Sequence, residues 1–167
     1  MKKKNAPYAI LILLAVVYAL LRFSSPSQIF VETSGGGIET PQVLPVSAKA
    51  IIGDSEILLE VAETPEQQAK GLMFRSEMPS DRGMLFPIEP EQEVQFWMKN
   101  VQIPLDIIFI RDSAIQNIET VDGCSSDSCS LVSSGEIVDQ VLEVPAGTAE
   151  ALGLRTNDEI KIIVLEE

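Results

Sequence analysis

The stretch from Phe96 to Ile110, which reads FWMKNVQIPLDIIFI, holds the residues whose types and spacing are best suited to chemistry. Two apolar runs flank a short polar break, a pattern that favours two buried strands joined by a turn. If residues 101–104 form the loop of a hairpin, Lys99 faces Asp106 across the two strands. Such a pair can be structural, can contact a ligand, or can supply a nucleophile or base. We expect a structural pair whose charges neutralise each other and fix the strand register. Catalysis is disfavoured because a lysine paired with a carboxylate stays protonated.

Three more side chains extend this set. Arg75 follows the motif GLMF, and its planar guanidinium suits either a ligand carboxylate or a structural pair with Glu143. Trp97 could stack on a sugar or an aromatic ligand, although a lone tryptophan in a strand is more often part of a core. The resulting polar cluster, which is either ligand-binding or structural, comprises Arg75, Trp97, Lys99, Asn100, Asp106 and Glu143.

The chain contains no histidine. It therefore lacks the commonest general base, the commonest metal ligand and any Ser-His-Asp arrangement. Several methionines could suggest a Cu(I) site, but their irregular spacing favours a role in filling the core. These are Met73, Met78, Met84 and Met98. We assign no catalytic residue, no metal and no cofactor from the sequence.

Cys124 and Cys129 lie in the polar segment GCSSDSC, separated by four residues. Zinc requires about four ligands, and a CxxC redox motif has only two intervening residues, so neither pattern fits. A disulfide that closes the loop is the favoured interpretation for an exported protein, and free thiols are the alternative.

Acidic residues dominate the charge of the chain. There are 12 Lys and Arg against 25 Asp and Glu, which gives a net charge of -13. Four of the basic residues precede Phe23, so the remainder carries 8 minus 25, or -17. Nucleic-acid affinity depends on Lys and Arg, so this balance argues against nucleic-acid binding. Cationic proteins and divalent cations remain electrostatically compatible partners.

The N-terminus has the layout of a membrane-directing segment. Lys2, Lys3 and Lys4 precede an apolar run from Ala6 to Leu21, which Arg22 follows. Sixteen apolar residues lie between the length of a signal-peptide core and that of a full membrane span. No clear cleavage site follows, so residues 1–23 are predicted to be an uncleaved anchor, with secretion after cleavage as the alternative. The lysines predict a cytoplasmic N-terminus and an extracytoplasmic domain.

Residues 24–45 are rich in Ser, Gly, Thr and Pro and predict a flexible linker, and residues 46–167 predict one folded domain. A hairpin is expected around Gly53 and Asp54, and Thr64 is expected to cap a helix that runs to about Leu72. Further strands are predicted at 83–86, 115–121, 141–144 and 160–165, with an acidic loop at 89–93 and a short helix at 148–152. The pattern favours a mainly β, barrel-like domain with two short helices rather than a βαβ fold.

Five sequence blocks, in order, resemble the domain-of-unknown-function 192 family over about residues 46–166. They are KGLMFR (70–75), GMLF (83–86), FWMKN (96–100), IPLDIIFI (103–110) and VLEVPAG (141–147). The resemblance implies a small β-rich, barrel-like domain, often behind an export segment, and it implies no established reaction. The family pattern has Thr where this chain has Val101, which weakens any interpretation in which that turn binds a ligand.

The sequence thus predicts a membrane-anchored, extracytoplasmic, non-enzymatic domain that binds a small ligand or a protein partner. The first alternative is an enzyme of unknown class that uses Lys99, Asp106, Arg75 or Glu143. The second is a structural accessory protein.

Overall fold

The computed structural model describes residues 40–126 and 128–166. In chain order the elements are β1 (Val46–Ile52), β2 (Ser55–Val61), α2 (Pro65–Lys70), β3 (Arg82–Gln92), β4 (Gln95–Trp97), β5 (Leu105–Arg111), β6 (Ala114–Val121), β7 (Leu131–Ser133), β8 (Val138–Pro145), α3 (Thr148–Ala151) and β9 (Lys161–Val164). The predicted β-rich class with two short helices is confirmed for this part of the chain. None of its helices is long and apolar enough to cross a membrane, and the predicted anchor lies outside the described residues.

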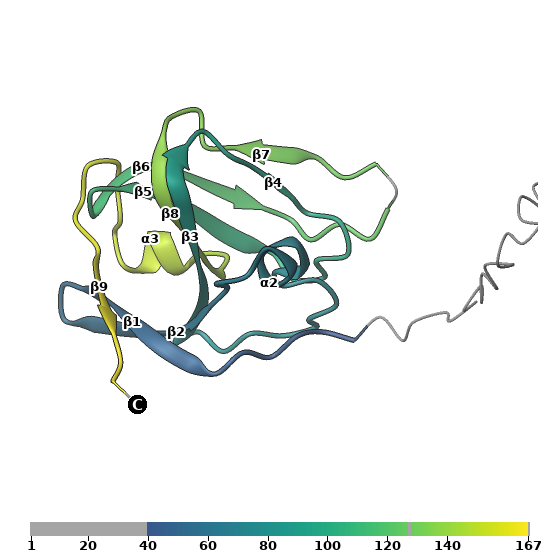
Figure 1. Ribbon diagram of the computed structural model, residues 1–167, viewed down its shortest axis with the longest axis horizontal. Helices are drawn as coiled ribbons and strands as arrows, with labels where there is room; N and C mark the ends of the chain where they lie inside the picture. Colours follow the sequence, from purple (N-terminus) through teal and green to yellow (C-terminus); the bar gives the residue numbers. More distant parts are fainter. Residues whose placement is uncertain (1–39, 127, 167) are drawn as a thin grey trace, which may run out of the picture. The chain divides into compact units, whose positions relative to one another are not determined.

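Seven strands form one curled sheet in the order β6-β5-β8-β3-β2-β1-β9 (Figure 1). Its two ends meet: the backbone N–H of Ile115 donates to Asp158, and that of Ile160 donates to Ser113, both at 2.9 Å. These bonds join the start of β6 to the chain that enters β9. The sheet therefore curls toward a barrel, as the sequence predicted.

One pair of neighbouring strands differs from the rest. β2 and β3 run parallel, whereas the other pairs in the large sheet are antiparallel. A parallel pair requires a crossover connection, and here the crossover contains α2. This single βαβ connection lies within a sheet that is otherwise antiparallel, so the predicted β-rich architecture, rather than a βαβ fold, is confirmed for the described residues.

The concave side of the sheet holds one apolar core. Strands from both ends of the sheet contribute to it, which places these side chains inside the curl. They include Ala48, Ala50, Leu59, Leu85, Ile108, Ile110, Ile115, Leu142 and Val144. Ala149 of α3 is buried as well, and Leu152, just after α3, packs against this core.

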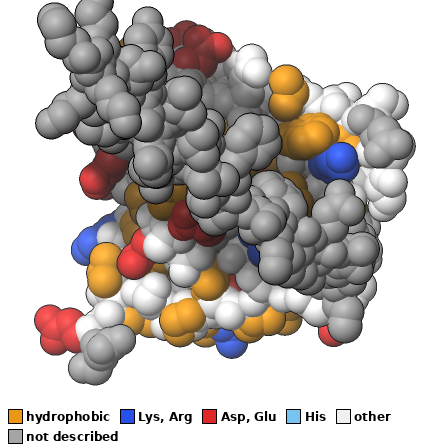
Figure 2. All heavy atoms as spheres, turned by 45° about the vertical axis from the view of Figure 1, so that its right-hand side comes forward, with side chains coloured by type: hydrophobic (Ala, Val, Ile, Leu, Met, Phe, Trp, Pro, Cys, Tyr) orange, Lys and Arg blue, Asp and Glu red, His pale blue; other side chains and the backbone are white. Residues whose placement is uncertain are grey.

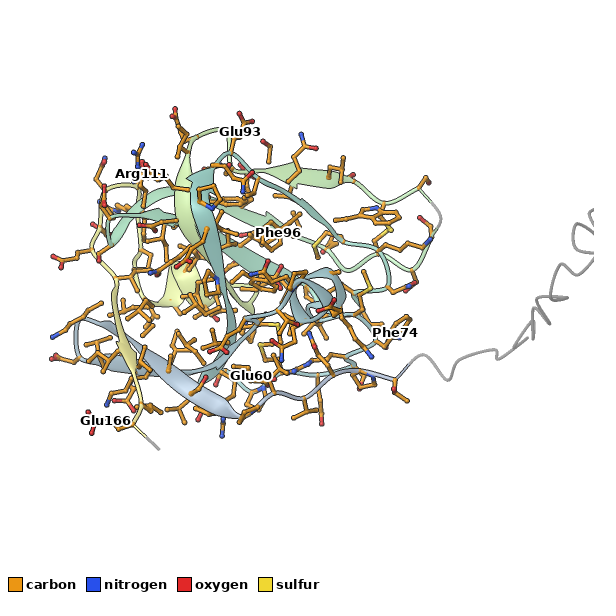
Figure 3. The ribbon with its side chains drawn as sticks, viewed as in Figure 1. Glu60, Phe74, Glu93, Phe96, Arg111 and Glu166 are labelled. Carbon is orange, nitrogen blue, oxygen red and sulfur yellow. A yellow bond between two sulfur atoms is a disulfide. The ribbon has the colours of Figure 1, made fainter. Side chains whose placement is uncertain are left out.

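A second core lies on the other face of β3, β8 and β5. Alternate residues of these strands supply it, among them Met84, Phe86, Ile107, Phe109 and Val141. Short segments cover it: Leu72 after α2, and the ribbon formed by β4 and β7. Phe96 of β4 (Figure 3) meets Phe86 edge to face at a centroid distance of 5.1 Å.

Local signals in the sequence account for the first elements. Gly53 and Asp54 form the loop of the predicted β1–β2 hairpin, in which Ile52 pairs with Ser55. The Thr64 hydroxyl accepts from the Gln67 backbone N–H, and the Gln67 side-chain oxygen accepts from the Thr64 backbone N–H. These two bonds complete the predicted capping box. The helix ends at Lys70 rather than near Leu72, because Gly71 leaves the helical conformation with φ 45°.

The predicted hairpin between residues 96–100 and 105–110 does not form. β4 pairs with β7, a strand not predicted from the sequence, and β5 lies between β6 and β8. Asn100 adopts a positive φ of 60°, which asparagine tolerates, and its carbonyl accepts from the Phe74 N–H at 2.7 Å. This turn directs β4 and β5 to different partners.

Lys99 and Asp106 are consequently not a pair. Asp106 is 1% exposed and accepts from the Thr120 hydroxyl at 2.7 Å and from the Ala149 N–H at 2.8 Å. The second bond satisfies a free backbone donor in the first turn of α3. The Lys99 ammonium instead lies 5.0 Å from the ring centroid of Trp97. The structural role expected for Asp106 is thus met by other partners.

We expect Asp106→Ala to lower the free energy of unfolding by roughly 2–4 kcal/mol, because it removes two hydrogen bonds to a buried, charged acceptor. Lys99→Met should cost less than about 1 kcal/mol, since it removes only an exposed cation–π contact. Thermal and urea unfolding of both single variants and the double variant test this. A coupling energy above about 1 kcal/mol between the two positions would contradict the observed partners.

Candidate ligand-binding cavity

Arg75 is held by Glu60 of β2. The guanidinium donates through Nη1 to Glu60 Oε1 at 2.8 Å and through Nη2 to Oε2, and both side chains are 10% exposed. The second carboxylate oxygen also accepts from the Leu44 N–H at 2.7 Å. Planar, two-point contact of this kind is what a guanidinium provides and an ammonium does not.

The same guanidinium fixes the chain that leads into β1. Arg75 donates to the Gln42 carbonyl at 2.8 Å, and the Gln42 amide donates to the carbonyls of Gln67 and Gly71, each at 2.8 Å. Residues 42–44 therefore belong to the domain, so the predicted linker boundary at residue 45 is a few residues too late. The segment is tied to the carboxyl end of α2.

Arg75 is therefore not available to Glu143, which corrects the predicted pair. Glu143 lies on β8 opposite Met84 of β3 and Ile107 of β5, on the face of the second core. It is 5% exposed, and no hydrogen bond or ion pair joins its carboxyl to another described residue. Burial raises the pKa of Glu143 from its ordinary 4.5 to about 8. The carboxyl group is consequently protonated at neutral pH.

Glu143 lines a cavity of about 420 Å³ between α2 and β4. Most of the other lining side chains are apolar, and three are aromatic. The lining residues are Gln68, Ala69, Lys70, Gly71, Leu72, Met73, Phe86, Ile88, Val94, Gln95, Phe96, Trp97, Val101 and Glu143. The cavity is thus an apolar space with one buried, unpartnered acid.

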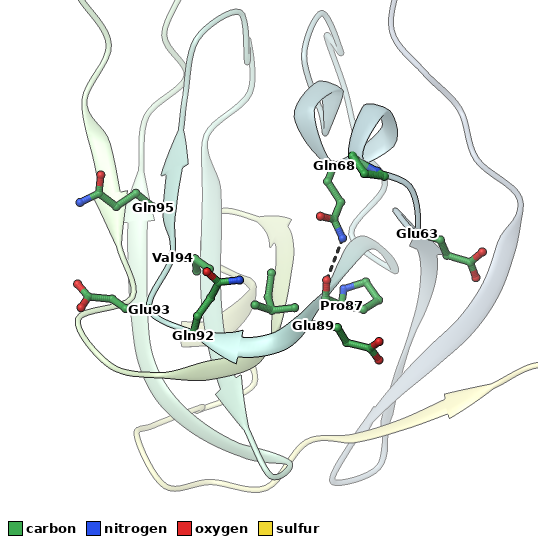
Figure 4. Close-up of a pocket in the computed structure, with 10 residues that line it drawn as sticks. Glu63, Gln68, Pro87, Glu89, Gln92, Glu93, Val94 and Gln95 are labelled. Carbon is green, nitrogen blue, oxygen red and sulfur yellow. Dashed lines mark hydrogen bonds between the residues drawn. The ribbon is translucent and has the colours of Figure 1, made fainter.

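A second, more polar cavity of about 520 Å³ adjoins the first (Figure 4). The two share Gln68, Ile88, Val94 and Gln95. Gln68 donates to the Pro87 carbonyl at 2.8 Å, which ties α2 to β3 beside this space. Three acids line this more polar cavity: Glu63, Glu89 and Glu93. In Figure 4 the first two lie on one side and Glu93 lies on the other.

Trp97 stands at the exposed side of the apolar cavity. Its side chain is 46% exposed although it lines the cavity, so a ligand could cover the ring. The ribbon that carries Trp97 is next to a loop closed by a disulfide. Cys124 and Cys129 are joined by a disulfide, and the Cys124 N–H donates to the Val101 carbonyl at 2.7 Å. The disulfide loop thus connects β6 to β7 against the segment after β4.

The six residues that the sequence grouped occupy different places. Arg75 is in the pair with Glu60, Asp106 is at α3, and Trp97 and Lys99 are on and beside the ribbon. Asn100 forms the turn through its backbone. Only Trp97 and Glu143 of the six line the apolar cavity. Among the described residues, no group of three or more His, Cys, Asp or Glu could hold a metal ion.

Sequence reasoning missed Glu60, Gln42 and the aromatic pair of Phe86 and Phe96. A signal for Glu60 was present, because it is the single acid within the apolar run ILLEVA of a predicted strand. The acid in VLEVP, Glu143, carries the same signal. A charged residue inside a buried strand requires either a partner or a function.

A family model described as "Uncharacterized ACR, COG1430" matches residues 48–162. The chain belongs to the DUF192 family. This confirms the resemblance expected from the five sequence blocks. No curated protein matches the chain.

Two solved structures resemble this DUF192 domain. A protein from Sinorhizobium meliloti 1021, described as a "putative transcription regulator", is 33% identical and has a TM-score of 0.63, covering 72% of this chain and 96% of its own. A protein of unknown function from Novosphingobium aromaticivorans DSM 12444 is 32% identical and has a TM-score of 0.61, covering 73% of this chain and 92% of its own. The similarity therefore extends over the whole domain.

The buried Glu143 carboxyl predicts a distinctive dependence of stability on pH. Between pH 4.5 and about 8 the folded protein keeps a proton that the unfolded chain releases, so stability falls as pH rises through this range. Glu143→Gln cannot ionise, so its stability relative to wild type should rise by on the order of 1.4 kcal/mol per pH unit across that range. Urea unfolding at a series of pH values measures the difference.

Glu150→Gln, at an exposed acid of α3, is the matched control and should show no such trend. Parallel curves for wild type and Glu143→Gln would contradict the buried, neutral carboxyl.

Proposed function

We propose that this DUF192 domain is a ligand-binding module that takes a small, largely apolar molecule into the cavity between α2 and β4. The observation that carries the proposal is the Glu143 carboxyl, which is buried in an apolar cavity without a described partner. Such a group is costly to bury, and a bound ligand can supply the missing hydrogen bond.

The size and lining of the cavity support the proposal. Ligand sites typically measure about 300–1,000 Å³ and combine apolar and aromatic walls with a few polar groups. Here Phe86 and Phe96 offer ring faces or edges, Trp97 offers a ring open to solvent, and Glu143 offers one polar contact. Gln68 and Gln95 add amide groups where the two cavities join.

An enzyme is the second candidate, and Glu143 is the observation that favours it. A carboxyl that is protonated near neutral pH is suited to act as a general acid. The other residues considered for catalysis are engaged elsewhere: Arg75 by Glu60, Asp106 by α3 and Lys99 by Trp97. Of the described residues that line the apolar cavity, Lys70 is the one further ionisable group. Binding is therefore the better-supported function.

A nucleic-acid role is not proposed, although one similar structure is described as a "putative transcription regulator". The chain after Phe23 carries a net charge of -17. Where the face drawn in Figure 2 is not covered in grey, the basic side chains are scattered between acidic and hydrophobic ones. Phosphate recognition requires clustered Lys and Arg.

We also propose that the domain is held outside the cytoplasmic membrane by residues 1–23. The supporting observations are the three lysines before the apolar run and the disulfide between Cys124 and Cys129. Disulfides persist mainly in oxidising compartments. The ligand would then be met in the periplasm or at the cell surface, and an accessory structural role is the alternative if no ligand binds.

Filling the cavity should block binding. Trp97 is the single tryptophan of the chain, so its emission reports on ligands that cover the ring. We expect 1-octanol to shift this emission to shorter wavelength in a saturable manner. Ala69 is an exposed residue of α2 that lines the cavity, so Ala69→Phe adds a ring at the solvent side of the cavity. It should weaken octanol binding about tenfold, as expected when about two methylene groups lose their buried space. Ala151→Phe makes the same change on α3, at an exposed position outside the cavity, and should bind like wild type. Equal affinities for both variants would place the ligand elsewhere.

The full-length protein should remain with the membrane fraction and be released by detergent. The reason is the apolar run near spanning length without a clear cleavage site after it. Fractionation followed by N-terminal sequencing checks this. A mature N-terminus beyond Phe23 in a soluble fraction would replace the anchor with a cleaved export signal.

A further inference from the structure

We propose that the ligand of the apolar cavity is an amphipathic organic amine, whose apolar body packs on Phe86 and Phe96 and whose ammonium group pairs with the Glu143 carboxylate. This inference rests on the proposed binding function and names the ligand class.

The geometry of Glu143 is the first argument. The side chain is more than nine-tenths buried, it lines the cavity, and its carboxyl has no partner among the described residues. Two carboxylate oxygens can accept several hydrogen bonds, and a primary ammonium carries three donors on a compact group. An apolar chain with a terminal ammonium therefore matches an apolar cavity that contains a single acid.

The energetic balance favours an amine over a neutral alcohol. Ionising Glu143 at pH 7 reduces affinity about tenfold, because its pKa of about 8 lies one unit above that pH. A hydrogen bond between charged groups increases affinity by about tenfold to more than a hundredfold. At pH 7 the second effect offsets or exceeds the first, and at pH 8, where ionising Glu143 costs only about twofold, the ammonium gains affinity.

The charges around the cavity favour a cation as well. Lys70 of α2 is the other ionisable residue that lines the apolar cavity, and it is only partly buried, so its ammonium can extend into solvent. The adjoining cavity carries three carboxylates, Glu63, Glu89 and Glu93. The acidic domain as a whole attracts cations and repels anions. A ligand carboxylate would meet Glu143 and these acids without a dedicated cation to offset them.

Binding of an ammonium should release a proton. The amine enters protonated, and Glu143 passes its own proton to the solvent as the ion pair forms. At pH 7 this release should approach about 0.9 proton per ligand, since about nine-tenths of Glu143 is protonated at a pKa of about 8. As the pH rises toward 8, the affinity for the ammonium should increase about tenfold per pH unit, and above pH 8 it should level off.

Isothermal titration calorimetry with the full-length protein in detergent tests the inference. The probes are 1-octylamine, 1-octanol and octanoate, each measured in two buffers of different ionisation enthalpy. We expect one octylamine per chain with proton release, weaker octanol binding without proton release, and no octanoate binding. Glu143→Gln keeps the shape of the side chain and should abolish proton release. At pH 8, where ionising Glu143 costs only about twofold in affinity, this variant should weaken octylamine at least about fivefold and leave octanol within about twofold. Ala69→Phe should weaken octylamine as it weakens octanol.

The outcomes separate the two proposals. Octanol bound as tightly as octylamine, octylamine bound without proton release, or octanoate bound to the cavity would overturn the amine class and leave the binding function intact. Binding of none of the three probes would overturn the binding function itself. Octylamine binding that persists unchanged in Ala69→Phe would show association with the acidic surface and would overturn the site.

Discussion

The ion pair between Glu60 and Arg75 determines how the second core accommodates its buried acids. One guanidinium binds both oxygens of Glu60 and also holds the entering chain at Gln42, which is bonded to the end of α2. Removing one partner of such a buried pair leaves an uncompensated charge. Arg75 is engaged by Glu60, and Glu143 has no cation partner among the described residues, so burial keeps its carboxyl protonated. Glu60 thus has a structural role, and the lack of a described partner for Glu143 supports the proposed ligand site.

The two faces of the sheet explain why the cavity lies where it does. The concave face is enclosed by the sheet itself, and its small and branched residues, such as Ala48, Ala50 and Ile110, fill the interior. The opposite face is covered by the loop after α2, by the two-stranded ribbon and by loop residues such as Leu44, Met78 and Ile103. These short covering segments leave a cavity between them. Trp97 lines its exposed side, and Glu143 lines it at a buried position. A ligand site at this position requires no opening of the main core.

Features that depend on residues close together in the sequence were predicted, whereas features that depend on residues far apart along the chain were not. The β1–β2 hairpin and the Thr64 cap depend on residues close in sequence, and both were predicted. The partners of Asp106 and Arg75 lie 43 and 15 residues away along the chain, and single-sequence patterns carry no information on such pairs. The interrupted apolar run at residues 96–110 satisfied the pattern of a hairpin, yet Asn100 turns the chain toward Phe74 instead. Glu143 was named from the sequence only as a partner for Arg75, and its lack of a partner among the described residues appeared only in three dimensions.

The account depends most directly on the ionisation state of Glu143. Carbon-13 NMR of the glutamate side-chain carboxyls, with the Glu143 signal assigned by its loss in Glu143→Gln, measures that state in the folded protein without a ligand. A titration midpoint near pH 8 is the predicted result, because burial without a partner disfavours the charged form. A midpoint near the ordinary value of 4.5 would show that water or another group solvates the carboxylate. That result would contradict the buried, unpartnered acid on which the proposed ligand site rests.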